Sequence, residues 1–355
     1  MNVKKISREN FEVILEEPTL YVDNKSRWRS GHMSHALAKL SEKSFIDFNS
    51  NCSAVRHAGH SAFGWIEYRL STDSGKTYSD IFDLEYSKKC MLDGVYCLSV
   101  EKAIACNDGT IVAFCLRNSV YGDSIGCMPW VAPTYIRSFD GGKTWTEPKK
   151  LNNFPGRVYG ALYLDGSIYV IQFCNEDFFG KKPDDIFRLF KSDDNGDSFF
   201  EVSSLPVESN GRSYCNILFD NKNRLHFYSY NSNAEDKMDH AVSEDFGKSW
   251  KVCEPCYLAK GIRNPQIGYV DGVYILHGRA GGVKGFVLYT STDAENFDEG
   301  TMLIDKKDAY CFYSNNLTLT DEKGEFMLIQ YSDTYDESCR VNVWHQVLRI
   351  KKTDN

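Results

Sequence analysis

Three arginines and one tyrosine occupy the same place in successive segments of the chain, eight residues before an acidic residue of a tight turn. The pairs are Arg157 and Asp165, Arg212 and Asp220, Arg263 and Asp271, and Tyr313 and Asp321. A planar guanidinium group binds a carboxylate through two parallel hydrogen bonds, so clustered arginines predict a site for a carboxylate ligand. Such a site forms only if equivalent positions of successive segments converge on one pocket.

The required architecture is indicated by a repeated eight-residue pattern, Ser-x-Asp-x-Gly-x-(Ser/Thr)-aromatic, which we call the box. Complete boxes begin at Ser71, Ser138, Ser192 and Ser243, and a copy without the glycine and the hydroxyl begins at Ser291. The aspartate can accept backbone N–H groups inside a turn, the glycine can adopt a positive φ, and the aromatic ring can pack beneath. We therefore expect each box to form a hairpin turn between two strands.

A second hairpin is expected between successive boxes. Each interval contains two apolar runs on either side of an acidic turn such as Asp165-Gly166 or Asp271-Gly272, which is typical of a β-hairpin. The boxes begin 67, 54, 51 and 48 residues apart, enough for four strands and one propeller blade each. The sequence predicts an all-β fold, a six-bladed β-propeller with four-stranded antiparallel blades. We expect one domain over residues 1–355, with a sixth blade over 312–350 that the N-terminal strand 11–21 closes.

The composition narrows the possible partners. With 42% hydrophobic and 14% aromatic residues the chain can bury a large core, and its net charge of −8 without a Lys/Arg block predicts binding to neither nucleic acid nor membrane. The twelve cysteines are scattered, and the lone pair Cys253-Glu-Pro-Cys256 lacks the further ligands of a zinc site, so neither a metal nor a cofactor is expected. No apolar run fits a signal peptide or a membrane span, and we expect a cytoplasmic protein.

In its repeated boxes the chain resembles the sialidase (neuraminidase) superfamily of six-bladed propellers. In that family the repeated turn is called the Asp box. The segment Tyr313-Ser-Asn-Asn-Leu-Thr-Leu-Thr-Asp321 is similar to the family's Tyr-Ser-x-x-x-x-Leu-x-Asp-Gly segment. The resemblance implies an exo-glycosidase that removes a terminal sialic acid or a related anionic nonulosonic sugar, with Tyr313 as the nucleophile. It also implies that arginines bind the sugar carboxylate, for which the candidates are Arg157, Arg212, Arg263 and Arg279.

The first blade departs from the family pattern. The family's Arg-Ile-Pro is replaced by Arg29-Ser-Gly-His32-Met-Ser-His35, and the loop expected to carry its acid/base aspartate contains no carboxylate. That loop carries His57 and His60, and an imidazole titrates near neutral pH, so we predict one of them as the acid/base. For the glutamate that assists the family's tyrosine, the sequence offers the candidates Glu101 and Glu208.

These departures leave two other functions open. A carbohydrate-binding propeller without catalysis would need the arginines but no acid/base. A glycosidase or lyase for another acidic glycan, such as a uronate, would use arginines for the carboxylate and histidine for proton transfer. In each case the partner is an anionic carbohydrate. Because the whole chain is acidic and repels an anion, recognition depends on the local arginine cluster.

Overall fold

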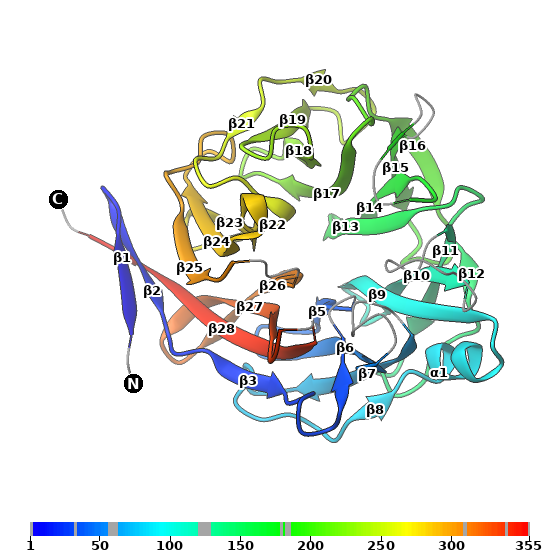
Figure 1. The fold of residues 1–355 in the computed structure, drawn as a ribbon. Helices are drawn as coiled ribbons and strands as arrows, with labels where there is room; N and C mark the ends of the chain where they lie inside the picture. The colour runs from blue at the N-terminus through cyan, green and yellow to red at the C-terminus, as the bar shows by residue number, and fades with distance from the viewer. Residues whose placement is uncertain are drawn as a thin grey trace.

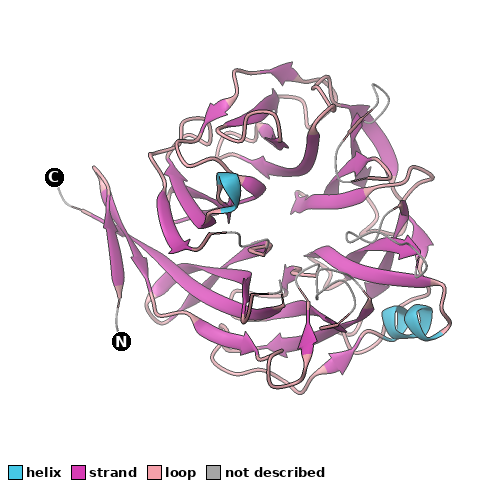
Figure 2. Cartoon of the chain, in the orientation of Figure 1, coloured by secondary structure: helices cyan, strands magenta, loops and turns pink. Residues whose placement is uncertain are grey.

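The computed structural model describes residues 3–31, 34–55, 63–119, 129–177, 180–181, 186–307, 311–337 and 340–353. These residues form six antiparallel sheets arranged radially around one axis, as Figure 1 shows, and the predicted six-bladed β-propeller is confirmed. Strands dominate, and within these ranges the helices are α1 (Glu85–Leu92) and the short 3-10 turn η2 (Gly281–Val283) (Figure 2).

The first three blades follow one another along the chain. Within each of them the strand numbers increase from the axis outward. Blade 1 contains β4 (Arg29–Ser30), β5 (Leu37–Lys39), β6 (Phe45–Ser53), β7 (Gly64–Ser71) and β8 (Phe82–Asp83). Blade 2 contains β9 (Tyr96–Ala105), β10 (Ile111–Ser119), β11 (Trp130–Ser138) and β12 (Lys149–Lys150). Blade 3 contains β13 (Arg157–Leu164), β14 (Ser167–Cys174), β15 (Ile186–Ser192) and β16 (Phe200–Ser204).

The other three blades complete the ring. Blade 4 contains β17 (Arg212–Phe219), β18 (Leu225–Asn231), β19 (Lys237–Ser243), β20 (Lys251–Val252) and β21 (Cys256–Tyr257). Blade 5 contains β22 (Arg263–Val270), β23 (Val273–Arg279), β24 (Gly285–Ser291) and β25 (Thr301–Asp305). Blade 6 contains β26 (Ser314–Asp321), β27 (Gly324–Thr334), β28 (Val341–Lys352), β1 (Lys4–Ser7), β2 (Phe11–Leu15) and β3 (Thr19–Val22).

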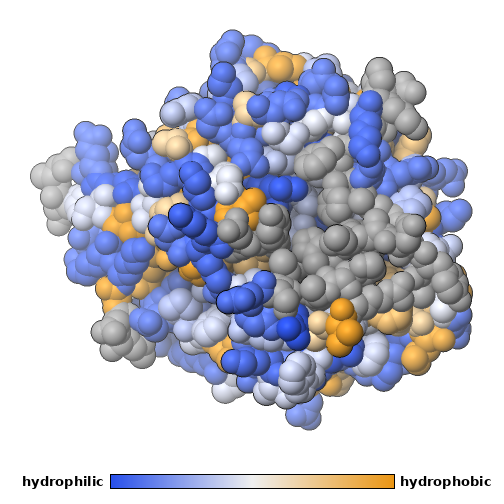
Figure 3. All heavy atoms as spheres, viewed as in Figure 1, coloured by the Kyte–Doolittle hydropathy of each residue, from blue (hydrophilic) through white to orange (hydrophobic). Residues whose placement is uncertain are grey.

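The inner strands line a central channel. Each contacts the next around the ring, from β5 through β9, β13, β17, β22 and β26 back to β5. Apolar side chains fill the space between neighbouring blades; Ile171 and Leu189 of blade 3, for example, lie in one buried cluster with Ile217 and Phe227 of blade 4. Burial of this apolar surface stabilises the ring. The face seen in Figure 3 is mainly hydrophilic, with apolar residues in scattered patches.

The boxes form the turns between the third and fourth strands, as predicted. In blade 2, Asp140 Oδ1 accepts the backbone N–H of Thr144 at 2.9 Å, and Ser138 Oγ accepts that of Gly142 at 2.8 Å. Gly142 has a φ of +89°, in the left-handed region that favours glycine. In the incomplete box Asn296 replaces the hydroxyl and donates its side-chain N–H to Asp293 Oδ2 at 2.8 Å. The Asp turn thus survives the loss of the glycine.

The N-terminal segment pairs with β28, but as two strands where the sequence predicts one. Phe11 of β2 lies opposite Lys352, and Leu20 of β3 lies opposite Trp344. Pro18 stands in the break between β2 and β3, and a proline cannot donate the backbone hydrogen bond of a continuous strand.

The described cysteines form no disulfide bonds with one another. Of the cysteines in the described ranges, ten are free thiols, and eight of those are buried, which fits small apolar core residues. None of the helices that the structure describes is both long enough and apolar enough to cross a membrane.

Candidate functional site

Residues that the sequence places in one register begin the inner strands at one end of the channel. Arg157 is the first residue of β13, Arg212 of β17 and Arg263 of β22, and Tyr313 directly precedes β26. Each strand runs from this end to the turn that carries its acidic residue. The four residues therefore occupy equivalent positions in their blades, as the sequence predicts. The direction of each side chain depends on the local backbone geometry.

Bulges change that direction in the inner strands of blades 2 to 5. The pairing of β9 steps over Glu101, and that of β13 steps over Tyr159. Shifts at the equivalent place lie between Arg212 and Cys215 in β17 and between Arg263 and Gln266 in β22. A bulge leaves one residue outside the alternation of a strand and re-aims its side chain. Here the bulged segments bring side chains of blades 2, 3 and 4 into mutual contact.

Arg157 is at the centre of that contact and is 2% exposed. Its Nε donates to Glu101 Oε2 at 3.1 Å and its Nη2 donates to Glu101 Oε1, which makes a bidentate ion pair. The guanidinium carbon lies 4.9 Å from the ring centres of Trp130 and Tyr214 and 5.3 Å from that of Tyr159. Glu101 already compensates the charge of Arg157, so this arginine organises the aromatic residues around it.

Tyr313 lies against the same aromatic residues and is 1% exposed. Its Oη is 2.7 Å from Tyr214 Oη, and its ring centre is 5.9 Å from that of His35 in blade 1. Burial raises the pKa of Tyr313, as does Tyr214, while the positive charges of Arg157 and Arg279 act in the opposite direction. Tyr313 is therefore a protonated phenol at neutral pH, and its phenolate is favoured by two nearby cations.

Arg263 and Arg279 are cross-strand neighbours on β22 and β23. The guanidinium carbon of Arg263 lies 5.4 Å from the ring centre of Tyr230, whose hydroxyl donates to Glu235 Oε1 at 2.7 Å. Arg279 is 2% exposed, and among the described residues no carboxylate pairs with it and its Nε has no hydrogen-bond partner. A buried cation without a counterion is costly, and a bound carboxylate would remove that cost.

Arg212 has its own carboxylate. Its Nε donates to Asp239 Oδ2 at 2.6 Å across β18, and its Nη1 donates to the Asn210 carbonyl oxygen at 2.8 Å. Of the other candidates, Glu208 is exposed and accepts the Asn210 backbone N–H at 2.8 Å. His57 and His60 lie outside the described residues. Arg157 and Tyr313 both contact Tyr214, while Arg279 lies opposite Arg263 and close enough to Tyr313 for its charge to oppose the rise in the pKa of that tyrosine. We call these five residues the arginine–tyrosine site.

Tyr159, Tyr214 and His35 belong to this region although the sequence interpretation did not select them. One signal was present: Arg157-Val-Tyr159 and Arg212-Ser-Tyr214 repeat an Arg-x-Tyr pattern at the start of successive inner strands. His35 lies in the segment that replaces the family's Arg-Ile-Pro, and its ring centre is 5.8 Å from that of Tyr159. Blade 1 therefore contributes an imidazole to this end of the channel.

Lys102 spans the channel next to the site, on the side toward the turns. Its Nζ donates to Gln266 Oε1 at 2.6 Å and to Asn315 Oδ1 at 2.8 Å, and Asn216 Nδ2 donates to the same Gln266 oxygen at 3.2 Å. Burial lowers the pKa of Lys102 to about 7. Side chains of blades 2, 4, 5 and 6 therefore form a polar layer across the channel, between the arginine–tyrosine site and the turns.

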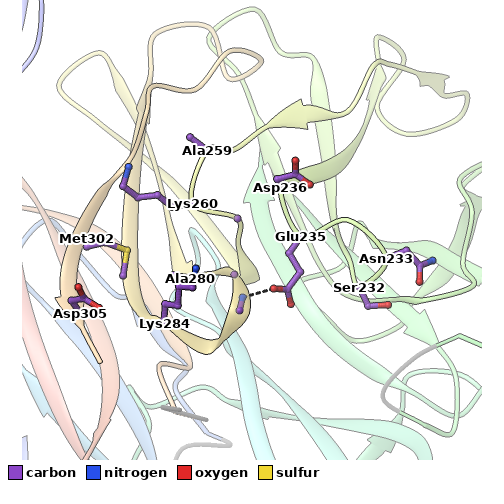
Figure 4. Close-up of a pocket in the computed structure, with 13 residues that line it drawn as sticks. Ser232, Asn233, Glu235, Asp236, Ala259, Lys260, Ala280, Lys284, Met302 and Asp305 are labelled. Carbon is purple, nitrogen blue, oxygen red and sulfur yellow. Dashed lines mark hydrogen bonds between the residues drawn. The ribbon is translucent and has the colours of Figure 1, made fainter. Parts of the chain in front are cut away.

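A groove of about 640 Å³ adjoins the site between blades 4 and 5 (Figure 4). Its charged lining residues are Glu235, Asp236, Asp305, Lys260 and Lys284. Its lining also includes Ala280, which follows Arg279 in the chain. In Figure 4 the carboxylate of Glu235 accepts the Gly282 backbone N–H, at 2.6 Å. The groove therefore offers both hydrogen-bond donors and acceptors to a polyhydroxylated ligand.

No protein-family profile and no curated protein matches the chain, whereas solved structures do. A protein of unknown function from Dyadobacter fermentans is 15% identical, with a TM-score of 0.71, over 96% of this chain and 99% of that one. A Hadza microbial sialidase is 14% identical, with a TM-score of 0.68, over 98% and 70%. The NanB sialidase from Streptococcus pneumoniae is 12% identical, with a TM-score of 0.64, over 93% and 70%. The chain thus has the propeller fold that these sialidases have.

Proposed function

We propose that the protein binds glycans that end in sialic acid or a related anionic nonulosonic sugar and hydrolyses the terminal glycosidic bond. The proposal rests on one observation: Arg279, a buried cation without a carboxylate partner among the described residues, lies beside Arg263 and near Tyr313. The shared fold with sialidases supports it.

Each residue then has a role. Arg263 and Arg279 bind the sugar carboxylate, and the Tyr313 oxygen bonds to the anomeric carbon as the bond to the leaving oxygen breaks. A neutral tyrosine suits an anomeric carbon that carries a carboxylate, because a carboxylate nucleophile would be repelled. His57 or His60 protonates the leaving oxygen, and the same imidazole then accepts a proton from the water that displaces Tyr313. Arg157 and Arg212 contribute at longer range, because Glu101 and Asp239 compensate their charges.

The remainder of the glycan would occupy the groove between blades 4 and 5. Its charged lining consists of three carboxylates and two lysines, one net negative charge. That balance favours an uncharged sugar over a second anionic one.

The proposal is tested by Tyr313→Phe with an aryl sialoside as substrate. We expect kcat to fall roughly 10³-fold or more, because the nucleophile is lost, with binding of the free sugar retained. Tyr228→Phe is the matched control: its hydroxyl is also buried, donates to the Ala294 carbonyl oxygen at 2.7 Å and lies outside the site. Unchanged hydrolysis by Tyr313→Phe, or no hydrolysis of any nonulosonide by the wild type, would contradict the proposal.

A second candidate function, carbohydrate binding without hydrolysis, is favoured by the engagement of Glu101 with Arg157, which occupies the carboxylate expected to assist Tyr313. Arg279→Met addresses binding alone. We expect the sugar dissociation constant, measured by calorimetry, to rise at least about 30-fold, since removing a buried charge partner costs about 2–5 kcal/mol. Arg188→Met, on β15 with its own partner Glu201, is the control. Binding that depends on Arg279, without any turnover, would select this second function.

A further inference from the structure

We infer that Tyr214 is a further catalytic residue, whose hydroxyl donates a hydrogen bond to the Tyr313 oxygen when that oxygen carries negative charge. The two Oη atoms are 2.7 Å apart, and either can be the donor. The rings meet edge to face with centres 5.8 Å apart, and both residues are at least 98% buried. The inference rests on the proposed function and names the group that acts on its nucleophile.

The hydroxyl of Tyr214 is held in place from behind. Its ring lies 4.9 Å from the guanidinium carbon of Arg157 and, centre to centre, 4.9 Å from the ring of Tyr159. Arg157 is itself fixed by its bidentate pair with Glu101. Tyr214 is thus confined on several sides, and the bulge in β17 sets the course of its backbone. A donor fixed before the reaction requires no reorganisation when charge develops.

Negative charge appears on the Tyr313 oxygen twice in the proposed reaction. The phenol gives up its proton to solvent water as it bonds to the anomeric carbon, and the oxygen leaves as a phenolate, which solvent water reprotonates, when water attacks the glycosyl-enzyme. Burial raises the pKa of Tyr313, so a buried phenolate needs stabilising partners. A hydrogen bond to an ionised oxygen is about twice as strong as one between neutral groups, so the contact to Tyr214 strengthens in both steps. Tyr214 therefore acts on the reacting oxygen and forms no covalent bond to the sugar.

The test is Tyr214→Phe, which keeps the ring and removes the hydroxyl, with aryl sialosides of good and poor leaving groups. We expect kcat to fall roughly 10- to 100-fold with KM changed less than about threefold, because the lost bond matters most in the charged states. With a good leaving group the second step becomes limiting, so pre-steady-state kinetics should show a burst of aryl alcohol. The burst amplitude also counts folded active sites, which separates chemistry from misfolding. Tyr228→Phe should retain wild-type kinetics.

A double-mutant cycle completes the test. Adding Tyr214→Phe to Tyr313→Phe should leave the residual rate unchanged, since the acceptor is already gone. If Tyr214→Phe keeps the wild-type kcat, or only raises KM, the inference is overturned while the proposed function stands. If wild-type protein hydrolyses no nonulosonide, it is the proposed function that fails.

Discussion

The two ends of the blades are built in different ways. At one end the boxes repeat nearly the same turn: in blade 1 Asp73 Oδ1 accepts the backbone N–H of Thr77 at 2.9 Å, and in blade 4 Asp245 Oδ1 accepts that of Ser249 at the same distance. At the other end side chains from different blades combine in one site, and Glu101, Arg157 and Tyr214 meet from three separate inner strands. The box end is stabilised locally, whereas the site end depends on the closed ring.

This contrast separates stability from chemistry. The hydrogen bonds that define a box turn lie within eight residues, and single bonds, such as that from the Tyr68 hydroxyl to the Gly142 carbonyl oxygen, tie the turn to the neighbouring blade. Glu101 and Arg157 are 56 positions apart and Tyr214 and Tyr313 are 99 apart, so these contacts form only after several blades have packed. Varied side chains at the site end, mounted on uniform turns at the other, allow function to change while the scaffold is retained.

The largest expected loss of stability comes from removing the ion pair at the site end. Arg157→Met leaves Glu101 as a buried carboxylate without its partner, and we expect a loss of about 3–5 kcal/mol in the free energy of unfolding, measured in urea. The double variant Glu101→Gln with Arg157→Met should recover a large part of that loss, because no lone charge remains. Equal losses in the single and double variants would show that packing, rather than charge, decides the stability here.

A smaller loss of stability is expected at acid pH, because of buried histidines near the box end of blade 4. His226 Nδ1 and His240 Nε2 are 3.0 Å apart, and His226 Nε2 lies 3.3 Å from Asp220 Oδ2. Burial lowers the pKa of both histidines, that of His240 to about 4. Between pH 6.5 and 4 the unfolded chain binds more protons than the folded one, so stability falls as pH falls.

One such histidine contributes about 1.4 kcal/mol per pH unit, or about 2 kcal/mol between pH 6.5 and pH 5. Urea unfolding at a series of pH values measures this slope. His240→Asn should reduce the slope in that window. A variant with the wild-type slope would show that the titrating group lies elsewhere.

The smallest effect is expected from a single box. Asp245→Ala removes an acceptor for Ser243 Oγ, for the Ser249 backbone N–H and for Ser249 Oγ; because the turn is largely exposed, we expect a loss of only about 1 kcal/mol. The hydrogen bond from the Ser249 side chain is the main cause that lowers the pKa of Asp245 to about 2. The contribution of this carboxylate is therefore complete above pH 4 and disappears toward pH 2, a range distinct from that of the histidines.

Asp245→Asn keeps one side-chain oxygen and should lose less than Asp245→Ala, with both measured by urea unfolding at pH 7. A loss of 3 kcal/mol or more in Asp245→Ala would mean that the turn is not local. The box end would then depend on contacts between blades, as the site end does.

The repeat predicted the fold because its contacts are short in sequence. Residues such as Ser138 and Asp140 specify a turn by themselves, and the spacing of such turns specifies the blades. Arg157, Arg212 and Arg263, each eight residues before the acidic residue of a tight turn, also stand at the starts of inner strands.

The partners of those arginines were not predictable in the same way. Arg212 pairs with Asp239 two strands outward in its blade, a contact that leaves no pattern in the chain. The bulges break the two-residue alternation, so a count along the strand does not show that Tyr159 and Tyr214 face Arg157. Only the repeated Arg-x-Tyr pattern carried that information.

The closure of blade 6 has a consequence for how the protein is made. Strands β2 and β3 are synthesised before their partner β28, and five blades lie between them in the chain, since Phe11 pairs with Lys352. Until β28 has been synthesised, β2 and β3 lack this partner strand, while blades 1 to 5 are free to fold in order. The closure of blade 6 therefore comes after the synthesis of the five other blades.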